Sequence, residues 1–167
     1  MPNRNNTIAY FSMEIGLDPA IPTYSGGLGV LAGDTIRAAA DLELPFAAVT
    51  LLYREGYFRQ AIDDNGRQIE EAANWRPEDH LEEMPQRVHV PLEGRNIYVR
   101  CFRLMVKGVS GHHVPIYFLD TDVPENDPRD RKITHALYAG DTDHRIRQEA
   151  ILGIGGGFVR QPLSFLR

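Results

Sequence analysis

Side-chain patterns in the first third of the chain predict two strands with a helix between them. Residues 7–14 are rich in β-branched and aromatic side chains, a composition typical of a strand. Residues 28–42 contain several alanines and favour a helix. The positions that recur there at helical spacing are Leu31, Thr35, Ala38 and Leu42. Residues 46–53 form a nearly continuous apolar run, which suits a strand buried on both faces. Together these segments predict a strand–helix–strand unit of an α/β fold.

The middle of the chain changes to the pattern of antiparallel hairpins. Residues 57–70 contain two short strand patterns around Asn65-Gly66, and Asn-Gly is the strongest short hairpin signal because both residues tolerate a positive φ. A second hairpin is expected over residues 88–106, and a further apolar strand over residues 114–119. We expect these hairpins to form an antiparallel insertion on the α/β core.

The last predicted element is a helix near the C-terminus. Asp141 suits its N-cap, because an aspartate side chain accepts hydrogen bonds from first-turn N–H groups. Glycines at 153, 155, 156 and 157 are expected to weaken this helix. Asp120, Asp122, Glu125 and Asp127 precede it and lack the central glycine and terminal glutamate of a calcium loop, so an acidic surface loop is expected there and no metal site.

Length and composition fit one globular domain. The chain has 167 residues, of which 43% are hydrophobic and 25% charged, as is ordinary for such a domain. Its net charge of −5 argues against a nucleic-acid partner, which needs a basic face. No segment approaches the roughly 18 uninterrupted apolar residues of a membrane span. A single cysteine allows no internal disulfide, and we expect a cytoplasmic protein.

Glycines gather where the first predicted helix begins. Gly26 and Gly27 precede the helix, and Gly29 lies in its first turn. Glycine lets a backbone approach a ligand closely, and first-turn N–H groups have no partners within the helix. With the positive end of the helix dipole, these groups suit a phosphate. A tight loop that needs glycine for its own geometry is the other interpretation, and the spacing alone does not decide between them.

The same glycines match one form of the dinucleotide-binding fingerprint. Gly27, Gly29 and Ala32 fit Gly-x-Gly-x-x-Ala. That fingerprint follows its strand directly, whereas about a dozen residues separate Glu14 from Gly27. The acidic residue expected roughly 20 residues further on is also misplaced, since Glu55 lies 28 residues beyond Gly27. A dinucleotide-binding oxidoreductase domain is therefore kept only as an alternative.

Several blocks in order along the chain are more specific than one glycine motif. They are residues 8–14 (IAYFSME), 24–34 (YSGGLGVLAGD), 51–60 (LLYREGYFRQ), 64–71 (DNGRQIEE), 74–75 (NW), 144–149 (HRIRQE) and 152–156 (LGIGG). This series resembles the N-terminal region of the α-glucan phosphorylases, the family of glycogen, starch and maltodextrin phosphorylases. The version here is similar to the short bacterial and archaeal type, and the likeness spans roughly residues 7–156.

The resemblance implies an enzyme that cleaves terminal α-1,4-glucosidic bonds of these glucans with inorganic phosphate and releases glucose 1-phosphate, a retaining hexosyl transfer. It implies pyridoxal 5′-phosphate on a lysine, with the phosphate group of the cofactor taking part in proton transfer. It implies two Rossmann-like domains facing a cleft, the GT-B type of fold, in enzymes that are often oligomeric. By this match Gly26, Gly27 and Leu28 face the substrate and cofactor phosphates.

Glu14 falls in the Ser-x-Glu block of the family. A carboxylate beside a phosphate is repulsive, so we expect Glu14 to order the loop by accepting backbone hydrogen bonds. In many members a tyrosine follows this glutamate by two positions and approaches the cofactor. This chain has Gly16 there, so that contact is not carried over.

The family also has parts that the matched blocks do not include. The cofactor lysine, the basic residues that grip substrate phosphate and the second Rossmann-like domain belong to later regions, so no catalytic residue is assigned. We expect residues 1–156 to be the N-terminal part of the catalytic region and residues 157–167 to be a divergent tail, as in a truncated or frame-shifted reading frame. Such a chain is expected to be inactive alone. A non-catalytic glucan- or phosphate-binding module is the other alternative.

Overall fold

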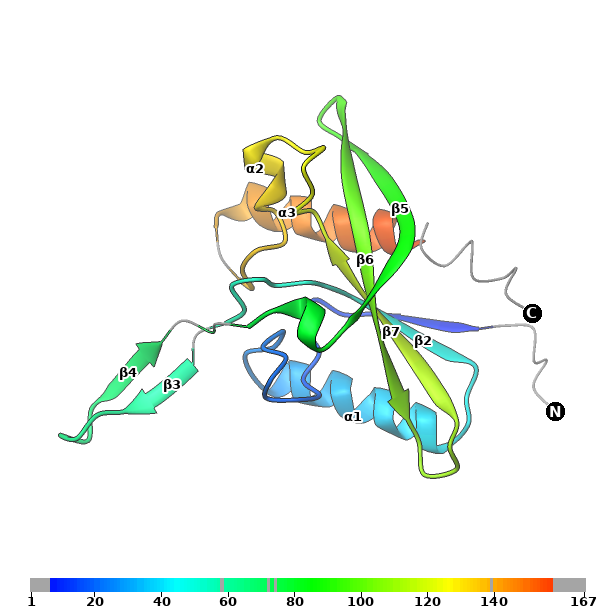
Figure 1. The fold of residues 1–167 in the computed structure, drawn as a ribbon, viewed down its shortest axis with the longest axis vertical. Helices are drawn as coiled ribbons and strands as arrows, with labels where there is room; N and C mark the ends of the chain where they lie inside the picture. Colours follow the sequence, from blue (N-terminus) through cyan, green and yellow to red (C-terminus); the bar gives the residue numbers. More distant parts are fainter. Residues whose placement is uncertain (1–6, 58, 72, 74, 139, 158–167) are drawn as a thin grey trace.

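The computed structural model describes residues 7–57, 59–71, 73, 75–138 and 140–157. Its main feature is a five-stranded sheet with the strand order β1-β2-β7-β6-β5 (Figure 1). These strands are β1 (Ile8–Phe11), β2 (Phe46–Leu51), β5 (Glu82–Leu92), β6 (Arg95–Lys107) and β7 (His113–Asp120). The tail expected at residues 157–167 lies outside the described residues except for Gly157.

The strand–helix–strand unit forms as the sequence predicts. The helix α1 (Gly27–Asp41) connects β1 to β2, and these two strands pair in parallel. β7 pairs in parallel with the other side of β2, so β2 is central, and all six of its residues are buried. The predicted α/β class is therefore confirmed. The relation to a two-domain glycosyltransferase fold stays a prediction.

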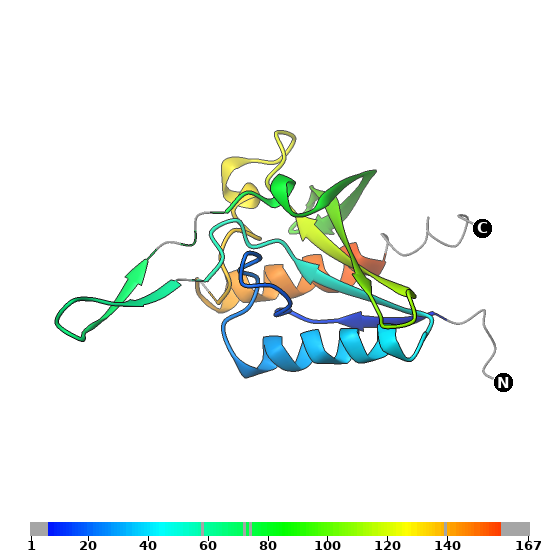
Figure 2. The same ribbon diagram turned by 60° about the horizontal axis from the view of Figure 1, so that its bottom comes forward.

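The antiparallel strands occupy two different places. β5 and β6 extend the main sheet beyond β7, because β6 pairs with both β5 and β7. β3 (Arg59–Ile62) and β4 (Gln68–Glu71) form a separate two-stranded sheet. This second sheet projects away from the body of the molecule (Figure 2).

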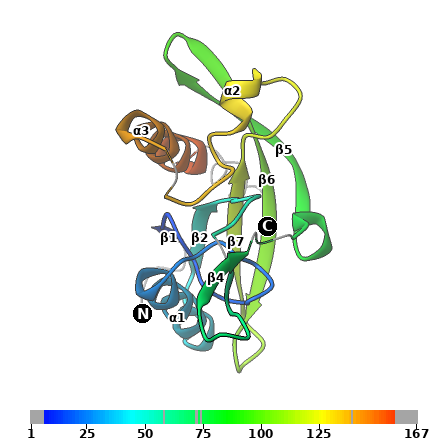
Figure 3. The same cartoon turned by 90° about the vertical axis from the view of Figure 1, so that its left-hand side faces the viewer.

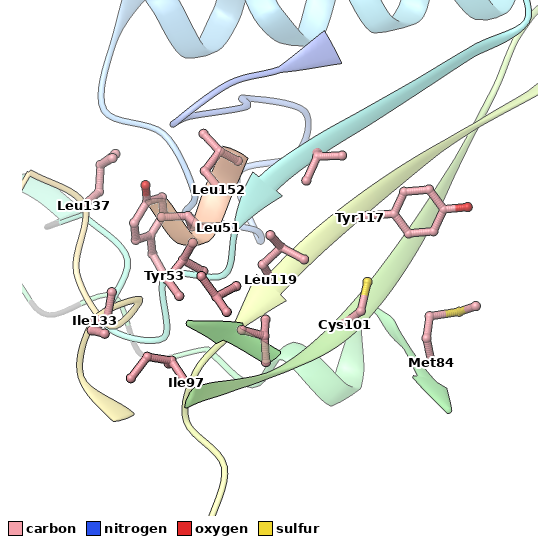
Figure 4. Close-up of a cluster of buried hydrophobic side chains, with 14 of the residues drawn as sticks. Leu51, Tyr53, Met84, Ile97, Cys101, Tyr117, Leu119, Ile133, Leu137 and Leu152 are labelled. Atoms are coloured by element: carbon pink, nitrogen blue, oxygen red, sulfur yellow. The ribbon is translucent and has the colours of Figure 1, made fainter. Parts of the chain in front are cut away.

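Apolar side chains cover both faces of the sheet. Alternate residues of a strand point to opposite faces. Ala47 and Val49 accordingly join a cluster that includes Ile151 from the C-terminal helix, and Figure 4 shows part of this cluster. Phe46 and Ala48 instead pack in the cluster formed by α1. Figure 3 shows the two helices on either side of β1 and β2.

The buried face of α1 is formed by Ile36 and several small residues. Leu31 and Leu42, two of the positions noted at helical spacing, are 61% and 69% exposed. A Cβ at Gly33 would overlap the carbonyl of Gly16, so the helix packs too closely on this side for large residues. The apolar residues that it buries are Ala32, Ile36, Ala39 and Ala40.

The C-terminal helix α3 (Thr142–Ala150) begins where predicted. Asp141 caps it by accepting a hydrogen bond of 2.9 Å from the backbone N–H of His144. Regular α-helix ends at Ala150, and at the glycines the chain widens into the π-helical turn η2 (Ile151–Gly155) and stays helical to Gly157, so the glycines distort the helix without ending it. These glycines allow close packing on the sheet, since a Cβ at Gly156 would lie 2.7 Å from the Phe11 ring.

Two short helical segments complete the described structure. The 3-10 turn η1 (Pro77–Asp79) and the helix α2 (Pro128–Arg131) are not predicted from the sequence. Both begin at proline, whose fixed φ suits the first position of a helix. Among the described residues, no helix combines the length and apolar character needed to cross a membrane.

Candidate functional site

The candidate site lies at the carboxyl ends of the three parallel strands. In open α/β sheets, ligands bind at this edge, in loops that follow the strands. The loop between β1 and α1, residues 12–26, contains the residues that the sequence assigns to phosphate. The next loop supports it, because the Tyr53 hydroxyl donates a 2.7 Å hydrogen bond to the Met13 carbonyl.

Glu14 is buried, and its carboxylate faces back onto the loop. Its Oε2 accepts hydrogen bonds from the backbone N–H groups of Ser25 (2.9 Å) and Gly26 (3.4 Å). Its Oε1 accepts a hydrogen bond from the Tyr138 hydroxyl. Only 4% of Glu14 is exposed. These contacts are the kind that a loop-ordering carboxylate makes, and its part in any reaction stays a prediction.

The N-terminus of α1 has the features of an anion site. Gly26 is the N-cap, no side chain caps the helix, and the first turn carries no acidic residue. By helix geometry the N–H groups of Gly27, Leu28 and Gly29 have no partner within the helix. A Cβ added at Gly26 or Gly27 would find no atom within 4 Å. Gly26 has an extended φ of −169°, so open space rather than backbone strain distinguishes these two glycines.

The other glycines of the region serve packing. A Cβ at Gly29 would overlap Tyr24 and lie 2.9 Å from Glu14 Oε2. A Cβ at Gly16 would lie 3.0 Å from the Tyr24 ring. The second glycine of the dinucleotide-like pattern therefore faces the protein's own loop, which argues against a dinucleotide pyrophosphate at that position. The Tyr24 ring occupies the space beside Gly16.

Tyr138 is the residue of this site that sequence reasoning missed. It lies 124 residues from Glu14 and belongs to none of the motifs. The hydrogen bond to Glu14 raises the pKa of Tyr138 to about 12, so the hydroxyl remains a proton donor at neutral pH. Its φ of 58° is in the left-handed region. The only local signal is the turn-forming Gly140-Asp141 that follows.

A second polar cluster surrounds Asp120, at the end of β7. Asp120 is fully buried, and its Oδ2 accepts hydrogen bonds from Arg54 (2.7 Å) and Arg100 (2.8 Å). Its Oδ1 accepts a 2.9 Å hydrogen bond from the backbone N–H of Asp122. The prediction of an acidic surface loop is therefore wrong at Asp120. Arg54 from the loop after β2 and Arg100 from β6 neutralise its carboxylate inside the protein. Within the described residues, no group of three or more His, Cys, Asp or Glu side chains could hold a metal ion.

The part of the chain that matches a known protein family includes the loop between β1 and α1. Residues 13–134 match the family model described as carbohydrate phosphorylase. A maltodextrin phosphorylase of Thermococcus litoralis is 44% identical over 162 residues, which cover 93% of this chain and 19% of that protein. A glycogen phosphorylase of Mycobacterium tuberculosis is 44% identical over 156 residues, with coverages of 89% and 18%. A glycogen phosphorylase of Aquifex aeolicus is 36% identical over 163 residues, with coverages of 94% and 23%. The chain thus spans about a fifth of the length of these relatives.

Proposed function

This chain belongs to the carbohydrate phosphorylase family, and from that premise we propose that it forms the phosphate-facing N-terminal part of an α-1,4-glucan phosphorylase. The complete enzyme would transfer the terminal glucosyl unit of glycogen, starch or maltodextrin to inorganic phosphate. The observation that carries the proposal is the open, acid-free start of α1 inside the segment that matches the family.

In this proposal the backbone of the loop holds the phosphate. The N–H groups of Gly27 and Leu28 point out of the helix start, where the helix dipole contributes about half a positive charge. Glu14 does not oppose this arrangement strongly, because its carboxylate is held by Ser25, Gly26 and Tyr138. The side chain of Leu28 is 68% exposed, so its contribution to phosphate binding comes from its N–H group.

The same helix start fits the phosphate end of pyridoxal 5′-phosphate. Open space at Gly26 and Gly27 and the absence of an acidic side chain in the first turn suit a dianionic group. When bound, the cofactor supplies a phosphate that exchanges a proton with the substrate phosphate. Lys107 is the last residue of β6 and pairs with His113 at the start of β7. It therefore lies at the amino end of the parallel strands, whereas the glycine loop follows the carboxyl end of β1. We assign the cofactor lysine and the second Rossmann-like domain to a region beyond the matched segment, with residues 1–156 as the N-terminal unit.

Titration of the 15N-labelled chain with inorganic phosphate tests the site directly. We expect saturable amide shifts at Gly27 and Leu28, because their N–H groups are free to bind an anion. Sulfate should compete with phosphate, and the first-turn amide of His144 in α3 serves as the control, since it already donates to the Asp141 side chain. Shifts at His144 as large as those at Gly27, or no response at Gly27, would contradict the proposal.

The isolated 167-residue chain is expected not to phosphorolyse glucans. The part of the reaction that its residues can supply is phosphate binding at one wall of the site. The measurement is glucose 1-phosphate release from maltoheptaose with phosphate and added pyridoxal 5′-phosphate. Turnover above the buffer blank by the purified chain would contradict this assignment, and addition of a phosphorylase that lacks its own N-terminal region is the positive control.

A further inference from the structure

The segment between α2 and α3 makes several hydrogen bonds to its surroundings before it reaches the candidate site. The buried side chain of Gln148 in α3 donates to the carbonyls of Ile133 (2.8 Å) and Ala136 (3.0 Å). The backbone N–H of Glu55 donates to the His135 carbonyl at 2.8 Å. These contacts hold the segment against α3 and against the loop after β2.

Tyr138 stands at the end of this fastened segment in a conformation that costs energy. Its φ of 58° is uncommon for a residue with a bulky side chain, and such residues persist where the surrounding structure enforces them. Its hydroxyl donates to Glu14 Oε1, and the Arg145 guanidinium lies 6.0 Å from the centre of its ring. Tyr138 is 42% exposed, so burial of its ring does not account for the conformation.

Glu14 connects Tyr138 to the loop amides. One carboxylate oxygen accepts the Tyr138 hydroxyl, and the other accepts the N–H groups of Ser25 and Gly26, immediately before α1. A carboxylate held at both oxygens has a fixed plane, whereas one held at a single oxygen is free to rotate. The direction in which Ser25 and Gly26 present their backbone therefore depends on the hydroxyl of Tyr138.

We propose that Tyr138 is a positioning residue that acts through Glu14 to fix the glycine loop in the conformation that receives phosphate at Gly27 and Leu28. That phosphate binds at this loop rests on the proposed function. That Tyr138 fixes the conformation of the loop does not depend on the proposed function. Tyr138 acts on the site through Glu14 and is not itself a catalytic residue. Its hydroxyl also satisfies one oxygen of the buried carboxylate, which lowers the negative charge that a phosphate meets.

The test is amide hydrogen exchange in the full 167-residue chain, with Tyr138→Phe removing only the hydroxyl. Exchange at Ser25 and Gly26 should become roughly tenfold faster, the size expected for loss of one hydrogen bond to a charged group. The matched control is Tyr98→Phe, because Tyr98 is 41% exposed and its hydroxyl has no hydrogen bond to the rest of the described chain. In a Glu14→Ala background, Tyr138→Phe should have less than a twofold further effect, because the connection is already lost.

Each result separates a positioning role from a general structural one. Unchanged exchange at Ser25 and Gly26 in Tyr138→Phe would overturn the inference, and so would equal acceleration at the amides of β2. Selective acceleration together with weaker phosphate response at Gly27 and Leu28 supports it. If wild-type chain shows no phosphate response while the selective acceleration is present, the proposed function fails and the fixing of the loop by Tyr138 stands.

Discussion

Replacing Asp120 with asparagine is expected to lower the free energy of unfolding by about 3 kcal/mol, because the buried carboxylate is the shortest ion-pair partner of both Arg54 and Arg100 and a neutral amide cannot replace it. The carboxylate of Asp120 is fully buried between Arg54 and Arg100, whose side chains are 20% and 18% exposed. All of its hydrogen-bond partners are donors. An asparagine must therefore turn its NH₂ group toward another donor.

Urea unfolding followed by circular dichroism measures this difference. The matched control is Asp34→Asn on α1, where Asp34 and its partner Arg37 are 66% and 50% exposed. An exposed pair of this kind contributes at most about 1 kcal/mol, so the control should unfold close to the wild type. A loss of stability in Asp120→Asn no larger than in Asp34→Asn would contradict the role given to the buried cluster.

The elements that follow from local physics could be predicted from the sequence. Asp141 is three residues before His144, which is the spacing that an N-cap needs, and the structure contains that hydrogen bond. The apolar run at residues 46–53 predicts a central strand, and β2 is buried and paired on both sides. The helix cap joins residues that are close in the sequence. The strand is predicted from the apolar character of its own side chains, without knowledge of which residues they contact.

Contacts between distant residues could not be predicted in the same way. The Tyr138–Glu14 and Arg54–Asp120 hydrogen bonds join residues separated by 124 and 66 positions. Neither pair has a spacing that marks it in a single sequence. Asp120 looked like part of a solvated acidic loop because its neighbours are acidic, whereas its burial is set by β6 and by the loop after β2.

The glycines show the same limit within one short motif. In the sequence, Gly26, Gly27 and Gly29 are alike, and all suit a phosphate or a tight turn. In the structure, Gly29 is required because Tyr24 and Glu14 fill the space beside it. Gly26 and Gly27 have no such neighbour. Packing therefore explains Gly29, whereas the role of Gly26 and Gly27 in binding phosphate stays a prediction.

That difference gives the substitution with the largest expected effect on activity, Gly27→Val. The enzyme for this test is a chimera in which residues 7–157 replace the matching part of the archaeal maltodextrin phosphorylase. Valine keeps its backbone N–H, but a side chain that keeps the phosphate from one preorganised donor costs ~3 kcal/mol, so we expect phosphorolysis of maltoheptaose to fall roughly a hundredfold. The space at the Cβ position of Gly27 is open, so a valine side chain can be accommodated there by this chain and is expected to compete with the phosphate for that space. Cofactor content, measured by absorbance, should stay the same because the lysine is supplied elsewhere.

The control distinguishes a blocked site from a damaged fold. Gly153 also has open space around its Cβ position, but it lies in η2 on the opposite face of the sheet from α1. Gly153→Val should therefore share any small loss of stability with Gly27→Val and should leave the rate and the phosphate dependence near wild type. A Cβ at Gly27 meets no atom of this chain within 4 Å, so we expect a loss of rate confined to Gly27→Val to reflect weaker phosphate binding rather than a damaged fold. If Gly27→Val changes neither the rate nor the phosphate dependence, the glycine loop is only a turn, and the phosphate must be held by other residues.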